Sequence, residues 1–151
     1  MITLRAVLAL GFLLASCAAV TAQTKPPAKQ SLLPVSFSWS SEYHPKGPRQ
    51  WSQTAPDQWT EKYEDGTPDR KFRLLGSMSM GGPCEGLHLK SNAEPLEAFV
   101  PGSACSSKWL LFRWVSIYTS KPNWVGQAEM QNIKYAPEGT KIPPRSKTNF
   151  P

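Results

Sequence analysis

The chain has 151 residues, of which 40% are hydrophobic and 19% charged, and it contains six Trp, six Phe and four Tyr. This length suits one ordinary domain and is too short for two, and the composition excludes both a wholly disordered chain and a multi-span membrane protein. The formal net charge is +6 at pH 7, and the 15 prolines and 10 glycines argue against long helices.

Residues 1–22 have the organisation of an export signal. Arg5 precedes an apolar run over residues 6–14, and small residues follow. The run is about half the ~20 residues that a membrane-spanning helix needs, so we expect it to be removed. Cleavage after Ala22 by a general signal peptidase would release the chain into solution.

A second processing site competes with this one. Residues 14–17, Leu-Ala-Ser-Cys, resemble the lipobox of bacterial lipoproteins. The resemblance implies that Cys17 becomes the acylated first residue, with each buried CH₂ of the acyl chains contributing about 0.8 kcal/mol to membrane binding. Ala18 in place of Asp resembles outer-membrane sorting in a two-membrane bacterium. The chain is therefore expected to be exported, as an outer-membrane or periplasmic lipoprotein or as a secreted protein.

Alternation of apolar and polar residues in the rest of the chain predicts strands. Residues 23–34 contain adjacent prolines and are expected to form a linker before a domain over residues 35–136. Residues 41–57, rich in Pro and Gly, are expected to form an irregular loop. The predicted strands cover residues 35–40, 58–63, 71–80, 86–90, 96–100, 108–119 and 124–135.

Two of these predicted strands have special features. The run 108–119 is apolar on both faces and is expected to be a central strand, with Trp109 and Trp114 buried in the core together with Trp39. Gly126 is a candidate bulge in the last strand.

The spacing of strands and turns indicates the fold class. About seven strands in about 100 residues predict an all-β fold, either a small β-sandwich or a barrel, and jelly-roll-like. Residues 137–151 are basic and rich in proline, and we expect them to form a disordered tail.

Two cysteines remain once Cys17 has been removed or acylated. Cys84 and Cys105 flank two strand-like runs joined by a turn, so a hairpin would bring them together at its open end. In an oxidising compartment they should form one disulfide, contributing about 3 kcal/mol on the chain-entropy model. With the scattered His44 and His88 they form no recognisable ligand set, so neither a metal nor another cofactor is expected.

The basic charge lies mostly outside the predicted domain. Residues 35–136 carry 11 Lys and Arg against 10 Asp and Glu. A groove that follows phosphates needs clustered positive charge, so nucleic-acid binding is not expected. Contact with a membrane is expected only through the lipid anchor.

The sequence contains few candidate catalytic residues. His44 lies in the predicted loop and His88 alternates outward beside Lys90, so both are expected on the surface, and no nucleophile elbow accompanies them. The acidic pairs Glu61 with Glu64 and Glu94 with Glu97 are three residues apart, which places the members of each pair on opposite faces of a strand. We therefore expect no enzyme, although cross-strand acid pairs leave a glycoside hydrolase as one alternative.

The tryptophan content is the most informative feature. Trp51, Trp59 and Trp124 flank predicted loops and are candidates for stacking on a polar ligand, the alternative being that they pack against the domain. Candidate hydrogen-bonding partners nearby are Tyr43, Arg49 and Asn123. These residues favour a non-catalytic binding domain for a glycan such as an envelope polysaccharide. A protein-interaction or inhibitor domain with an envelope protein as its partner is the other alternative.

Overall fold

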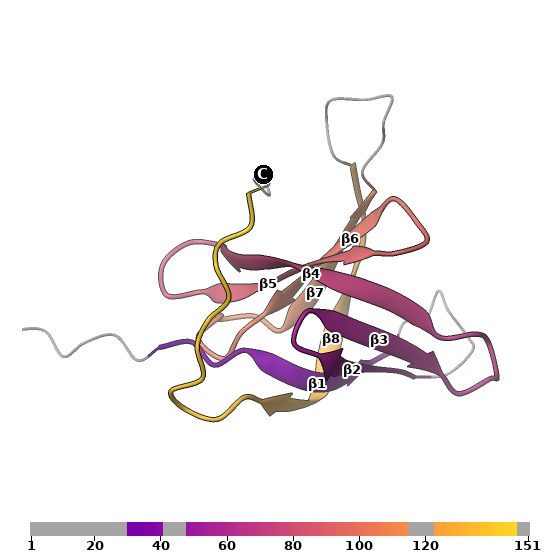
Figure 1. Cartoon of the computed structure of the whole chain (residues 1–151), viewed down its shortest axis with the longest axis horizontal. Helices are drawn as coiled ribbons and strands as arrows, with labels where there is room; N and C mark the ends of the chain where they lie inside the picture. Colours follow the sequence, from indigo (N-terminus) through magenta and orange to yellow (C-terminus); the bar gives the residue numbers. More distant parts are fainter. Residues whose placement is uncertain (1–29, 41–47, 115–122, 148–151) are drawn as a thin grey trace, which may run out of the picture.

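The computed structural model describes residues 30–40, 48–114 and 123–147, with the side chains of residues 123–125 left out. The protein is all-β, as predicted, and its strands close into one barrel (Figure 1). The strands are β1 (Pro34–Trp39), β2 (Arg49–Ala55), β3 (Gln58–Tyr63), β4 (Arg70–Ser79), β5 (Glu85–Ser91), β6 (Leu96–Pro101), β7 (Trp109–Trp114) and β8 (Asn123–Tyr135).

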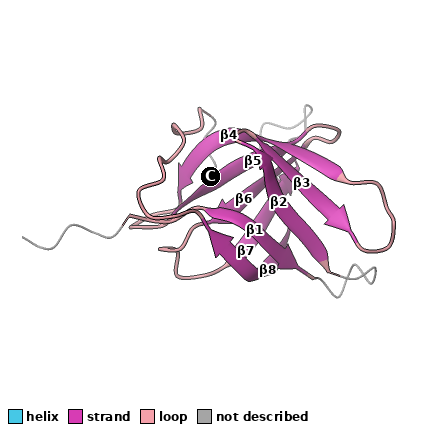
Figure 2. Ribbon diagram, turned by 60° about the horizontal axis from the view of Figure 1, so that its bottom comes forward, coloured by secondary structure: helices cyan, strands magenta, loops and turns pink. Residues whose placement is uncertain are grey.

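Each strand pairs antiparallel with the next, and β8 pairs with β1 to complete the ring (Figure 2). Of the two predicted architectures the barrel is therefore correct. Its connections run up and down between neighbours, so the jelly-roll order is not the one observed. Joining the first and last strands removes the two edge strands that an open sheet of the described strands would have, which is how small up-and-down barrels avoid edge-to-edge association.

The strand that sequence analysis missed is β2, which lies inside the predicted loop 41–57. Trp51 is the only large apolar side chain in β2, so its sequence shows no alternation of apolar and polar residues that could predict a strand. Register explains why the segment is extended: Trp51 lies opposite Phe37 of β1 and Glu61 of β3. Pairing with neighbours on both sides therefore overrides the weak local signal.

The barrel interior is filled by side chains from all eight strands. The ring of Trp51 lies 5.4 Å from that of Phe37, 4.4 Å from Phe72 and 6.2 Å from Phe112, measured between centroids. Trp51 and Trp59 are each only 1% exposed. Burial of this aromatic cluster stabilises the fold by roughly 25 cal/mol per Å² of apolar surface removed from water.

Two tryptophans predicted to lie in the core are instead exposed. Trp109 is 40% and Trp114 39% accessible, whereas Leu110, between them in sequence, is fully buried. The prediction of a central strand covered on both sides is wrong for Trp109, because a barrel strand turns only one face inward. Trp114 is the last residue of β7, where the barrel opens. Residues 115–119 of that predicted strand lie outside the described residues.

The predicted disulfide between Cys84 and Cys105 is present. It joins the β4–β5 connection to the β6–β7 connection, at the open end of the β5–β6 hairpin, as expected. The predicted bulge in β8 is also found, since Phe112 pairs with Gly126 while Arg113 pairs with Trp124.

Residues 137–147, here called the strap, were predicted to be disordered but lie against the barrel (Figure 1). Strand β3 pairs only with the first residues of β4, so the second half of β4 has an open edge on that side. The strap occupies this edge: the Ser77 amide donates to the Pro144 carbonyl, and the Ser146 amide donates to the Ser77 carbonyl, both at 2.9 Å. Ile142 packs against the core from the strap.

The opposite terminus also differs from its prediction. Ser31 and Leu33, expected in a linker, are buried against the barrel, and β1 starts at Pro34. The signal sequence, Cys17, Tyr43 and His44 lie outside the described residues. The described part of the chain contains no helix of the length and apolarity that spanning a bilayer requires.

Candidate functional site

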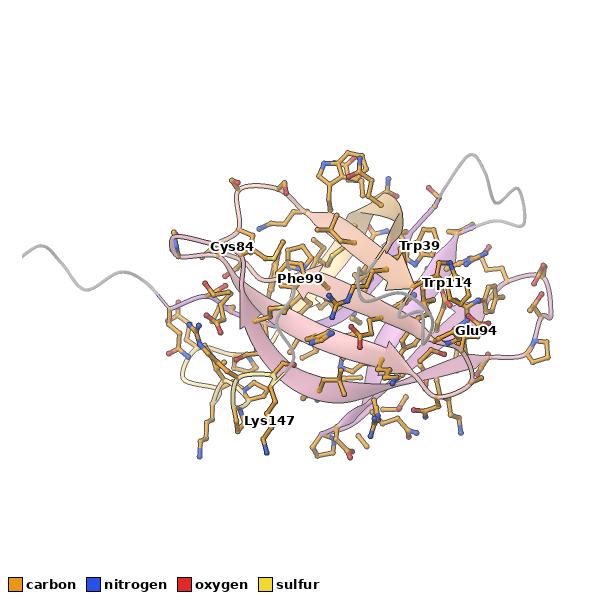
Figure 3. All side chains as sticks on the ribbon, turned by 90° about the horizontal axis from the view of Figure 1, so that it is seen from above. Trp39, Cys84, Glu94, Phe99, Trp114 and Lys147 are labelled. Carbon is orange, nitrogen blue, oxygen red and sulfur yellow. A yellow bond between two sulfur atoms is a disulfide. The ribbon has the colours of Figure 1, made fainter. Side chains whose placement is uncertain are left out.

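One end of the barrel carries a cluster of charged and aromatic side chains. Because the strands run up and down, β1, β3, β5 and β7 end here, and the strands that follow them begin here. We call this end the mouth. Figure 3 shows Trp39, Trp114 and Glu94 at the mouth, with Cys84 towards the opposite end.

The first layer of the cluster is a row across three strands. Arg49 of β2 lies opposite Trp39 of β1 and Tyr63 of β3. Its guanidinium carbon is 4.8 Å from the centroid of the Trp39 ring and 4.6 Å from that of Tyr63. Two cation–π contacts thus fix the arginine in place, and its side chain is only 12% exposed.

The second layer is built around the buried carboxylate of Glu61. Trp51 Nε1 donates to Oε1 at 2.9 Å, and the Tyr63 hydroxyl donates to Oε2 at 2.9 Å. Arg49 Nη1 lies 3.6 Å from Oε1 of this carboxylate, and Arg70 Nη1 lies 3.6 Å from Oε2. Both carboxylate oxygens therefore have hydrogen-bond donors and positive charges, which is what a buried acid requires.

These surroundings also hold the proton on Tyr63. Burial, followed by the negative charge of Glu61 and the hydrogen bond to it, raises the pKa of Tyr63 to about 12. The tyrosine therefore remains a neutral donor at any ordinary pH.

An open groove of about 450 Å³ lies beside this cluster, between the β3–β4 and β5–β6 connections. Arg70 links the buried layer to the groove, because its Nη1 approaches Glu61 and its Nη2 lies 3.6 Å from Glu94 Oε1. The groove offers an aromatic ring, cations, carboxylates and an amide, a mixture suited to a polar ligand. The side chains that provide these groups are Tyr63, Asp69, Arg70, Lys71, Asn92 and Glu94.

The predicted ligand-binding residues are only partly brought together here. Arg49 and Trp51 meet at Glu61, as described above. Trp59 lies deeper in the core rather than beside an open loop, and its buried Nε1 has no hydrogen-bond partner among the described residues. Asn123 and Trp124 begin β8, and only their backbone is described. A ligand-binding role for these residues stays a prediction.

Sequence reasoning missed Glu61, Tyr63, Arg70 and Glu94 as members of a binding site. One signal was available: Trp59, Glu61 and Tyr63 alternate on one face of a strand, which places a carboxylate between two aromatic residues pointing inward. Arg70 and Glu94 lie on other strands and loops, so their approach to this face required the barrel register.

A second polar cluster lies on the outer wall of the barrel. His88 was predicted to be a surface histidine, but it is fully buried, because the strap lies over this part of β4 and β5. Its Nε2 lies 2.8 Å from Glu97 Oε2, and its Nδ1 lies 2.8 Å from Ser146 Oγ of the strap. Arg113 donates to the same Glu97 oxygen through Nε at 2.7 Å and Nη2 at 2.6 Å.

The ionisation of Glu97 follows from these contacts. Burial alone would raise its pKa, but the hydrogen bonds and charges of His88 and Arg113 outweigh burial, so the pKa is lowered overall. Glu97 is therefore an ionised acceptor at neutral pH.

The acidic pairs considered for glycoside hydrolysis do not act as local pairs. Glu94 approaches Arg70 at the groove, whereas Glu97 belongs to the outer-wall cluster. Glu61 is buried with both oxygens occupied, and Glu64 is exposed. Within the described ranges no group of three or more His, Cys, Asp and Glu could hold a metal ion.

Comparisons with known proteins add no family to this description. No family model matches the chain, and no curated protein or solved structure is significantly similar to it.

Proposed function

We propose that this is an exported binding domain of the bacterial envelope, either lipid-anchored or secreted, that holds a glycan in the groove at its mouth without acting on it chemically. The observation that carries the proposal is the buried carboxylate of Glu61, with Arg49 and Arg70 against it, next to an open polar groove.

A barrel that required only stability would gain little from this arrangement. The free energy lost on removing two charges from water often exceeds the free energy gained from their attraction. Apolar residues of similar size commonly stabilise a core at least equally. Charged groups held rigidly beside a concavity are instead typical of binding sites, where they orient the side chains that touch a ligand. Arg70 is placed to do this, since it contacts both Glu61 and Glu94.

The chemistry of the groove favours a polyhydroxylated ligand. Arg70 and Lys71 can donate hydrogen bonds to hydroxyl groups, Asp69 and Glu94 can accept them, and the ring of Tyr63 offers an apolar face. The cations and carboxylates balance each other in number, which suits a neutral sugar better than a phosphate chain. Neutral envelope polysaccharides are such ligands, and peptidoglycan fragments present similar hydroxyl groups on a charged glycopeptide.

Titration of the full chain with soluble polysaccharide or peptidoglycan fragments tests the proposal. Tryptophan fluorescence should respond, because Trp51 is hydrogen-bonded to the carboxylate beside the groove. Asn92→Ala and Lys71→Ala remove groove side chains that make no contact in the buried layer, and each should weaken binding by about three- to tenfold, the equivalent of one lost hydrogen bond.

Arg73→Ala is the matched control for the groove variants, since Arg73 is exposed on β4 but does not line the groove. Its affinity should equal that of the wild type. An absence of binding to any of these glycans, or an equal loss in Arg73→Ala, contradicts the proposal.

Exposed aromatic residues support one second candidate, a domain that binds an envelope protein. Trp109 and Trp114, 40% and 39% exposed, are the residue type that most often anchors protein interfaces. If this is the function, pull-down from envelope extracts should recover a stoichiometric partner that Trp109→Ala and Trp114→Ala lose. Recovery of the partner by both variants at wild-type levels rules these residues out as its anchors.

The lipid anchor is tested separately. Cys17→Ser should abolish acyl labelling and release the protein from membranes. If the wild-type protein carries no acyl label, lipid anchoring is excluded and the secreted form is the remaining alternative.

A further inference from the structure

The buried cluster on the outer wall has the connections of a base-activated serine. Glu97 is ionised and has no proton to give, so it must accept from His88, and Nε2 of the ring carries the hydrogen. Nδ1 of the ring lies 2.8 Å from Ser146 Oγ. With the ring in the neutral tautomer that carries its hydrogen on Nε2, Nδ1 is an acceptor and the Ser146 hydroxyl is the donor in this bond.

A concavity lies beside this serine, separate from the groove at the mouth. It has a volume of about 450 Å³ and is open to solvent, and Ser146 lines it. Its walls are largely apolar, from Leu74 and Leu75 of β4 and Pro143 of the strap, and Arg145 and Lys147 flank Ser146. A short acyl chain fits such walls. Lys147 and Arg145, whose Nη2 also lies 3.7 Å from Glu85 Oε2, add positive charge beside Ser146 that can stabilise negative charge developing on a carbonyl oxygen.

We propose that Ser146, His88 and Glu97 form a hydrolytic site for carboxylic esters, with Ser146 as the nucleophile, His88 as the general base and Glu97 as the positioning residue. The sequence predicts surface histidines without a nucleophile elbow, and so no enzyme. The strap changes this for His88, because it brings Ser146, 58 residues away in sequence, within 2.8 Å of the ring.

The reaction would proceed in two steps, acylation of Ser146 and hydrolysis of the acyl-serine. Ser146 Oγ attacks the ester carbonyl carbon while its proton passes to His88 Nδ1, and the resulting imidazolium is stabilised by Glu97. The proton then moves to the leaving oxygen, the carbon–oxygen bond breaks and an alcohol departs. Water, deprotonated by His88, attacks the acyl-serine, and a carboxylic acid is released as Ser146 Oγ takes back the proton.

Arg113 completes the arrangement without touching substrate. It holds the same oxygen of Glu97 that His88 contacts, so the carboxylate cannot rotate away from the ring. A residue that orients the base in this way is typical of activated nucleophiles.

The direct test is covalent labelling of the full chain with a fluorophosphonate, followed by intact mass and peptide mapping. One adduct per chain on Ser146 is expected, with none in Ser146→Ala and an undiminished adduct in Ser106→Ala, an exposed serine in the β6–β7 connection. Absence of an adduct on Ser146 in the folded wild type overturns the proposal.

Turnover of a chromogenic short-chain aryl ester provides the second measurement. Ser146→Ala should lower kcat/KM by about 100-fold or more, the usual contribution of an activated nucleophile and base. Glu97→Gln should lower the midpoint of the pH–rate profile as well as the rate, because the imidazolium loses its carboxylate. An unchanged midpoint in a folded Glu97→Gln protein would reduce Glu97 to a structural role and overturn its assignment.

A pair of cysteine variants tests the same contact without relying on a loss of activity, which a misfolded variant would also show. Ser146→Cys and Ser40→Cys each introduce one thiol, the second at an exposed position after β1 and away in sequence from the disulfide. The thiol beside His88 should react with iodoacetamide about tenfold faster at pH 7, because the base favours the thiolate. Equal rates would show that His88 does not activate position 146. Neither result depends on the glycan proposal, since Asn92→Ala should leave labelling unchanged and Ser146→Ala should leave glycan affinity unchanged.

Discussion

Gly76 and Pro144 meet backbone to backbone, with no room for a side chain between them. A Cβ atom on Gly76 would lie 2.5 Å from the carbonyl oxygen of Pro144 and 2.5 Å from the amide nitrogen of Ser146. The same residue has φ +145°, which other residues rarely adopt. This absent side chain lets the strap approach β4 closely enough to pair with Ser77, and so brings Ser146 to His88.

Gly76→Ala should therefore detach the strap. We expect a loss of about 2 to 4 kcal/mol from the strained φ and the clash together, and faster proteolysis at the strap. Urea unfolding and limited trypsin digestion, which cuts after Arg145 and Lys147, measure the two effects.

Gly66→Ala is the control for backbone strain alone. Gly66 has φ +81°, and a Cβ atom on it would meet nothing within 4 Å, so its replacement should cost about 1 kcal/mol and leave the strap protected. If both variants cleave at equal rates, the contact between Gly76 and Pro144 does not hold the strap.

Reduction of the disulfide should destabilise the end of the barrel opposite the mouth. Cys84 and Cys105 are 21 residues apart, a loop for which cross-linking contributes about 3 kcal/mol on the chain-entropy model. Urea unfolding with and without reductant gives the difference. A Cys84→Ser, Cys105→Ser double variant should match the reduced wild type, and a midpoint that reductant does not shift would contradict the expectation.

Glu61→Gln should be among the most destabilising single changes that preserve side-chain volume. It leaves the partly buried Arg49 and Arg70 without their shared carboxylate, and breaking one partner of a buried pair costs about 3 to 5 kcal/mol. Glu64→Gln, three residues further along and exposed, should change the free energy of unfolding by less than about 0.5 kcal/mol. Equal stability of the two variants would show that the ion pairs at Glu61 contribute nothing net.

The fold class could be predicted from local sequence because a barrel strand with one buried face produces the period-two alternation. Phe37 and Trp39 in β1, or Leu87 and Leu89 in β5, show it plainly. The same rule failed for β2, where Trp51 is the only large apolar residue. It also failed for Trp109, where apolar residues on both faces suggested cover that the described structure does not provide.

The two clusters could be predicted less well, because each joins side chains that are distant in sequence. Glu61 reaches Arg70 only through the β3–β4 register, and Glu94 joins them from a loop. His88 was placed correctly on the outer face of its strand, yet its burial depends on a proline-rich segment that compositional reasoning assigns to disorder. Packing of the strap against an open strand edge is a tertiary effect with no local signal.

Alkaline pH should weaken the fold through Tyr63. Its pKa is about 12 in the folded protein and 10.0 for an unperturbed tyrosine, so above pH 10 the unfolded chain loses a proton that the folded chain keeps. The contribution of this group is therefore complete below pH 10 and is lost as the pH rises to 12. In Tyr63→Phe the fall in unfolding free energy over this range should be smaller, although Tyr135, whose pKa burial also raises, will contribute a remaining part. Urea midpoints at pH 8, 10 and 11 for both proteins measure the difference, and parallel pH dependences would show that Tyr63 ionises as readily in the barrel as in the unfolded chain.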